Sequence, residues 1–168
     1  MMTNGRSDNV NTRNLVVDIL LAVTRDGAFS HIAIRDVLDK YRYLPKQDRA
    51  FITRLSQGTI ERMIELDAII NQFSKTKVKK MKPVIAAILR SGVYQLKYMD
   101  SVPDSAACNE AVKLTVKRGF GGLKGFVNGV MRTIARNMDQ ICYPDAEKEP
   151  VRYLSVKYSV PEWLRSEE

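Results

Sequence analysis

Histidine and cysteine are scarce in this sequence of 168 residues, which contains one His and two Cys. The single His31 argues against a His-based metal cluster and leaves little material for a Ser/His/Asp triad. Cys108 and Cys142 lie too far apart in the sequence to suggest a disulfide framework or a metal knuckle. Cys108 has no adjacent base or cation that would lower its pKa, so we expect it in the core. We predict no catalytic residue and no metal site in this chain.

Long apolar runs are absent as well. No stretch approaches the roughly 18 apolar residues of a membrane span, and the polar N-terminal residues lack the apolar core of a secretory signal. We therefore expect a cytoplasmic protein without membrane contact. Alternation of apolar and polar residues over the length of a strand is also missing, so no strand is predicted.

Acidic residues are few relative to basic ones, with 19 Asp and Glu against 27 Lys and Arg and a net charge of +8. Two blocks contain no acidic residue at all, Asn71 to Met99 and Ala111 to Met138. The lysine-rich segment from Ser74 to Lys82 is too polar to pack and is expected to be an exposed loop. This segregation is typical of a surface that binds a polyanion, although a solvated basic face without a ligand would give the same pattern.

Apolar residues recur at helical spacing along most of the chain, which predicts an all-α bundle of about six or seven helices. The predicted helix starts are Thr12 as a cap, Ser30, the residues after Pro45, Pro83, and Asp104 or Ser105 as a cap. The helix after Pro45 is expected to run unbroken for about seven turns, to Phe73. Gly58 inside it predicts the close approach of another backbone, because Gly costs a helix about 1 kcal/mol relative to Ala.

We divide the chain into three parts. Residues 1–11 are expected to be a disordered N-terminus, residues 12–138 the helical domain, and residues 139–168 a connector. The connector is rich in proline and acidic residues, and we expect it to lead to a further domain outside this chain.

The glycine-rich stretch GFGGLKGFVNGVMRTIAR, from Gly119 to Arg136, matches neither of the common nucleotide-binding loops. The order Lys124-Gly125 is the reverse of a Walker loop, and a dinucleotide loop would follow a strand rather than a helix. We predict a turn between two helices, with Gly119 in the left-handed conformation. Gly125 and Gly129 would then form a small-residue face against which another helix packs. A phosphodiester would bind the N-terminus of the second helix beside the basic residues, and a turn that merely connects is the equal alternative.

Several phrases resemble one family of RNA-binding domains. The segments LPKQDRAFITRLSQGTIERMIELDAIINQF, VIAAILRSGVYQLKYMDSVPDSAACNEAVKLTVK and GFVNGVMRTI are similar to the NusB-like domain at the N-terminus of Sun-type 16S ribosomal RNA (cytosine-5) methyltransferases. Its hallmarks here are Asp48-Arg49, Gly58, the run from Leu89 to Leu96, Val102-Pro103, Asn109-Glu110-Ala111-Val112 and Phe126-Val127-Asn128. The segment KYSVPEWL, Lys157 to Leu164, is similar to the link between that domain and the methyltransferase part, so an N-terminal fragment is expected.

The resemblance implies a NusB-like helical bundle that positions small-subunit ribosomal RNA for its own C-terminal methyltransferase domain, with a ribosomal protein as a possible further partner. It implies S-adenosylmethionine and the catalytic cysteines for the missing domain, and no cofactor for this segment. The candidate RNA-binding residues are Arg13, Lys75, Lys77, Lys79, Lys80, Lys117, Arg118, Lys124, Arg132 and Arg136. Tyr41, Tyr43 or Phe120 would stack on unpaired bases. Asp48-Arg49 and Asn109-Glu110 are expected to pair helices.

Two alternatives remain. A free-standing NusB-type antitermination factor would share the fold, but such factors usually have an arginine-rich first helix, and here that helix offers only Arg13 and Arg25. The second alternative is a helical module that docks a protein without touching RNA. Binding of a protein by such a module would depend little on salt, unlike binding to phosphates.

Overall fold

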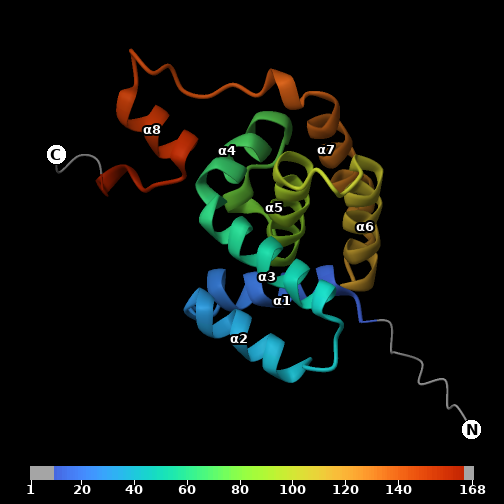
Figure 1. Ribbon diagram of the computed structural model, residues 1–168. Coiled ribbons are helices and arrows are strands. Elements are labelled where there is room, and N and C mark those ends of the chain that lie inside the picture. The colour runs from blue at the N-terminus through green and yellow to red at the C-terminus, as the bar shows by residue number, and fades with distance from the viewer. Residues whose placement is uncertain (1–9, 165–168) are drawn as a thin grey trace, which may run out of the picture.

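The computed structural model describes residues 10–164, and Figure 1 shows this part of the chain as a bundle of helices. The α-helices are α1 (Thr12–Thr24), α2 (Ser30–Lys40), α3 (Lys46–Glu61), α4 (Met63–Phe73), α5 (Pro83–Tyr98), α6 (Asp104–Lys117), α7 (Lys124–Arg136) and α8 (Pro150–Tyr158). Short 3-10 helices occupy Val78–Lys80 (η1), Gly121–Leu123 (η2), Met138–Gln140 (η3) and Glu162–Leu164 (η4). The described residues contain no strand, which confirms the all-α prediction.

Helix α5 forms the centre of the bundle, where it packs against α1, α3, α4, α6 and α7. Its residues Ile85, Ile88, Leu89 and Val93 are at most 1% exposed. Burying an aliphatic side chain of this size contributes about 1.5–3 kcal/mol, so the apolar faces that surround α5 hold the fold together. No helix within residues 10–164 is long and apolar enough to cross a membrane.

The predicted seven-turn helix is wrong in one respect, because it breaks at Arg62 into α3 and α4. Arg62 has φ −103° and ψ 14°, outside the helical range. The backbone N–H of Ile64 donates to the Oγ of Ser159 at 3.2 Å instead of continuing the helical ladder. A break of one residue hardly disturbs the apolar spacing, which is why the sequence pattern runs through it.

Gly58 lies on α3 opposite a side chain rather than the backbone that we predicted. A Cβ at Gly58 would lie 2.2 Å from the ring of Tyr94 on α5. The glycine therefore makes room for an aromatic ring between α3 and α5.

The helix starts at Ser30 and Pro83 are confirmed, whereas two predicted caps are wrong. Asn11 rather than Thr12 caps α1, and its Oδ1 accepts from the N–H of Asn14 at 3.0 Å. Pro103 occupies the N-cap of α6, so neither Asp104 nor Ser105 does. The N-terminal residues predicted to be disordered lie outside the described part except for Val10 and Asn11.

The predicted connector contains a helix that packs on the bundle. Residues 141–164, called the C-terminal arm from here on, follow η3, cross to the far side of α4 and end in α8 and η4. Helix α8 contacts α4, as Figure 1 shows, and Ser159 ends it in the left-handed conformation with φ 52°.

Candidate nucleic-acid interface

The glycine-rich stretch forms the predicted corner between α6 and α7. Gly119 has φ +86°, a conformation that L side chains rarely adopt, and the N–H of Phe120 closes the turn by donating to the carbonyl of Thr115 at 2.9 Å. Helix α7 follows after η2, and among the described residues no side chain caps its N-terminus. The N–H of Lys124, the first residue of α7, donates to the carbonyl of Gly121. The positive end of the helix dipole lies here, where an anion would be favoured.

A pocket of about 490 Å³ lies between α6 and α7 beside this corner. Its lining residues are Asn109, Val112, Lys113, Lys124, Gly125 and Asn128. Lys113 and Lys124 are both exposed. The Nζ of Lys113 also donates to Oε1 of Glu110 at 3.4 Å in an exposed ion pair, which a phosphate would have to compete with. Sequence reasoning missed Lys113 and the two amides, because only the packing of α6 on α7 brings them together.

The glycines of α7 do not receive another helix, contrary to our prediction. No described atom lies within 4 Å of a Cβ built at Gly125 or Gly129, and both residues are exposed. They leave the outward backbone of α7 open beside the ammonium group of Lys124. A phosphate could therefore approach this backbone closely.

Arg132 joins the two helices that line the pocket. Its Nη2 donates to Oδ1 of Asn109 on α6 at 2.7 Å, and its Nε donates to Oδ1 of Asn128 at 3.2 Å. Both amide oxygens are thereby engaged, which leaves the amide N–H₂ groups as donors for a ligand. That Arg132 itself contacts RNA stays a prediction.

Arg13 and Lys117 meet in a second pocket of about 380 Å³, at the start of α1. Two carboxylates, Asp48 and Glu110, line the same pocket and offset the two cations. The Nε of Arg13 donates to Oε1 of Gln95 at 2.8 Å, and burial lowers the pKa of this guanidinium. Phosphate is therefore attracted less strongly here than at the pocket between α6 and α7.

Arg118 is engaged within the chain. Its Nη2 donates to a carboxylate oxygen of Asp18 at 2.6 Å, and its Nε donates to Oδ1 of Asn14 at 2.8 Å. The side chain is only 20% exposed. Arg118 thus ties the glycine corner to α1, and its predicted contact with RNA would require these bonds to break.

The lysine-rich loop lies at the other end of α7. It follows α4, whose Gln72 bonds to Cys142 just after α7 and η3. The 13 residues of α7 span about 20 Å at 1.5 Å per residue, so the loop and the glycine corner are far apart. The candidates Lys75, Lys77, Lys79, Lys80 and Arg136 are all exposed at this end. The prediction that this loop is exposed and does not pack is wrong in part, because Ser74 and Val78 are buried.

Other predicted residues have clear positions. Tyr43 is 67% exposed and available for stacking, whereas Tyr41 and Phe120 pack partly against the core. Cys108 is fully buried as predicted, and burial raises the pKa of its thiol. Arg49 pairs helices as expected, because its Nη1 donates to the carbonyl of Leu38 at the end of α2 at 2.6 Å.

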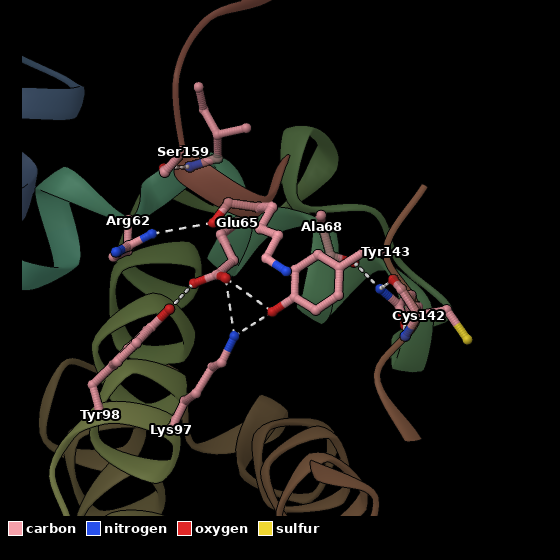
Figure 2. Close-up of polar contacts among 11 residues, drawn as sticks. Arg62, Glu65, Ala68, Lys97, Tyr98, Cys142, Tyr143 and Ser159 are labelled. Atoms are coloured by element: carbon pink, nitrogen blue, oxygen red, sulfur yellow. Dashed lines mark hydrogen bonds and ion pairs between the residues drawn. The ribbon is translucent and has the colours of Figure 1, made fainter. Parts of the chain in front are cut away.

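A second polar cluster surrounds Glu65 on α4 and was not predicted. Figure 2 shows Tyr98, Lys97 and Tyr143 converging on its carboxylate, which is only 2% exposed. The Nζ of Lys97 and the hydroxyl of Tyr143 each donate to Oε2 of Glu65 at 2.9 Å. The hydroxyl of Tyr98 donates to Oε1. Because these residues come from α4, α5 and the C-terminal arm, no local pattern announces the cluster.

Comparison with known proteins gives concordant matches. The profile of the NusB family matches residues 10–136. The probable ribosomal RNA small subunit methyltransferase B of Bacillus subtilis is 36% identical over 155 residues, which are 92% of this chain and 34% of that protein. The chain therefore spans about a third of the length of this relative.

Two further matches are to NusB proteins. The transcription antitermination protein NusB of Nitratidesulfovibrio vulgaris is 32% identical over 127 residues, which are 69% of this chain and 77% of that protein. Among solved structures, antitermination factors NusB and NusE in complex with dsRNA give a TM-score of 0.68 at 21% identity, covering 74% of this chain and 93% of that chain.

Proposed function

This chain belongs to the NusB family, and from that premise we propose that it is an RNA-binding domain that positions ribosomal RNA for a methyltransferase domain of a longer protein. The extent of similarity supports the methyltransferase context. The family profile ends at residue 136, whereas the similarity to the Bacillus subtilis methyltransferase takes in 92% of the chain and so continues into the C-terminal arm. A free-standing antitermination factor would account for the bundle but not for that continuation.

The pocket between α6 and α7 carries the RNA-binding part of the proposal. It combines two exposed ammonium groups, Lys113 and Lys124, with the amides of Asn109 and Asn128 and the uncapped start of α7. Ammonium groups and helix N-termini hold phosphates, and the amide N–H₂ groups offer donors to bases or ribose hydroxyls. This combination suits a surface that binds a nucleic-acid backbone.

S-adenosylmethionine, which a methyltransferase of this kind would use, is assigned to the part of the protein outside this chain. The glycine corner does not fit such a cofactor, because it follows helix α6 and is not the strand-to-helix loop that cradles a nucleoside or dinucleotide. The catalytic cysteines are assigned to that part too. Small-subunit ribosomal RNA is the proposed partner of this chain.

The test is the affinity of the 168-residue chain for small-subunit ribosomal RNA fragments over a salt series. Contact with about five phosphates of single-stranded RNA gives a log–log slope near −3.5. Changing Lys113 and Lys124 to Gln should reduce the magnitude of that slope by about 1.4. The matched control changes Lys79 and Lys80 to Gln, which removes the same charge at the other end of α7 and should leave the slope nearly unchanged.

Three outcomes would contradict this assignment. An equal loss of affinity in both double variants would mean that binding follows net charge rather than the pocket between α6 and α7. Loss only in the loop variant would move the RNA surface to the other end of α7. Absence of RNA binding, together with salt-independent binding of a ribosomal protein, would favour the protein-docking function.

A further inference from the structure

The C-terminal arm is bonded to the bundle at three places along α4 and α5. We propose that the arm is a docked strap, latched by Glu65, that fixes where the chain leaves the bundle. The docking itself does not depend on RNA binding. Its consequence for positioning RNA rests on the proposed function.

The first attachment is the buried carboxylate of Glu65. A carboxylate that is 2% exposed is costly unless donors surround it. The bundle supplies Lys97 and Tyr98, and the arm supplies the hydroxyl of Tyr143, which also bonds to the Nζ of Lys97. Figure 2 shows the hydroxyl of Tyr143 directed at both the Glu65 carboxylate and the Lys97 ammonium, so the arm completes this charged cluster.

The second attachment fixes the beginning of the arm. The Oε1 of Gln72, near the end of α4, accepts from the N–H of Cys142 at 2.9 Å. The Nε2 of the same side chain donates to the carbonyl of Cys142 at 2.7 Å. One amide thus satisfies both backbone groups of a single arm residue, which holds that residue in position and orientation.

The third attachment lies at the end of α8, where the arm meets the break between α3 and α4. The N–H of Ile64 donates to the Oγ of Ser159, and the Nη1 of Arg62 donates to the carbonyl of Lys157, both at 3.2 Å. The break leaves a backbone donor without a helical partner, and the arm supplies its acceptor. The interruption of the long helix and the docking of α8 are therefore parts of one arrangement.

The arm's side of each attachment lies beyond the NusB family match, which ends at residue 136. It lies where the similarity to the methyltransferase continues past that match. The arm starts at the end of α7 that is about 20 Å from the glycine corner. A strap docked in this way holds the exit of the chain at a set distance and direction from RNA bound at the corner.

Hydrogen exchange of the 168-residue chain tests the strap. The amides of α8 should exchange well below the rate of an unstructured peptide. Tyr143→Phe and Gln72→Ala should each raise the exchange rate of the α8 amides about tenfold, while the amides of α5 stay protected. Tyr158→Phe is the matched control, because this tyrosine lies on the same arm but is 53% exposed. Trp163, the only tryptophan, gives a second readout, since its fluorescence anisotropy should fall when the latch is removed.

Two results would overturn the proposal. One is exchange of the α8 amides in the unmodified chain at the rate of an unstructured peptide. The other is indistinguishable behaviour of Tyr143→Phe and Tyr158→Phe. The RNA titrations are separate from these measurements, so a mobile arm with intact RNA binding would refute the strap alone. Protected α8 amides without RNA binding would refute the proposed function alone.

Discussion

At the scale of single residues, internal pairing separates basic side chains that are available for a ligand from those that are not. Arg118 already donates to Asp18 and Asn14, whereas Lys124 is exposed at the start of α7. Moving Arg118 to a phosphate would leave the Asp18 carboxylate unpaired, which offsets much of the gain. The basic side chains within residues 10–164 are therefore not equally available to an anion.

Residues of the Glu65 cluster predict how stability responds to alkaline pH. Burial, and next the hydrogen bond to Glu65, raises the pKa of Tyr98 to about 12, and the pKa of Tyr143 is also raised. An unfolded chain ionises its tyrosines near pH 10, while these two remain neutral in the folded state. Their contribution to the free energy of unfolding is thus fully present below about pH 10 and is lost as the pH rises to about 12.

Urea unfolding at a series of alkaline pH values measures this loss. The free energy of unfolding should fall between about pH 10 and 12, and the fall should be smaller in Tyr98→Phe. Tyr158→Phe should behave as the unmodified chain does. An equal fall in Tyr98→Phe would show that other groups, such as lysines, cause it.

At the scale of elements, the corner between α6 and α7 depends on where each glycine lies. Gly119 follows the end of α6 and has a left-handed backbone conformation, while Gly129 lies inside α7 on an exposed face. The first position needs glycine because of its backbone, whereas the second is open to any residue that suits a helix.

Opposite effects on stability are expected from two alanine substitutions. Gly119→Ala should lower the free energy of unfolding by about 1 kcal/mol, because φ +86° is strained for a residue with a Cβ. Gly129→Ala should raise it by up to about 1 kcal/mol through helix propensity, since no described atom lies within 4 Å of the new Cβ. Chemical denaturation measures both, and shifts of the same sign would contradict the assignment of these two positions.

At the scale of the whole molecule, α7 separates the proposed RNA-binding pocket from the site where the C-terminal arm leaves the bundle. The exposed pocket with Lys113 and Lys124 lies at its start, and the C-terminal arm departs from its end and returns to α4. This arrangement leaves the proposed RNA surface free of the arm.

Removing residues 141–168 should destabilise the bundle without unfolding it. The family match ends at residue 136, so the helices α1 to α7 retain their core. Glu65 would lose one donor and its cover, which should cost about 1–3 kcal/mol. Thermal unfolding followed by circular dichroism, with a chain ending at residue 164 as control, would show a lower but still cooperative transition. An unchanged midpoint would mean that the arm adds nothing to the bundle.

Local chemistry in the sequence was enough to predict much of the fold. Apolar spacing identified the helical class, and Ser30, Pro83 and Gly119 marked two helix starts and one corner. These signals work because a helix ladder, a proline ring and a left-handed glycine each act within a few residues.

Tertiary structure alone decided the break at Arg62, the engagement of Arg118 and the latch at Glu65. The donors to Glu65 lie 32 to 78 residues away along the chain, and Arg118 bonds to residues 100 and 104 positions away. Such partners meet only after the helices have packed, and burial then makes each unpaired polar group costly enough to select its partner. The sequence therefore predicted where the helices and the basic blocks lie, and packing determined which charges are paired within the chain.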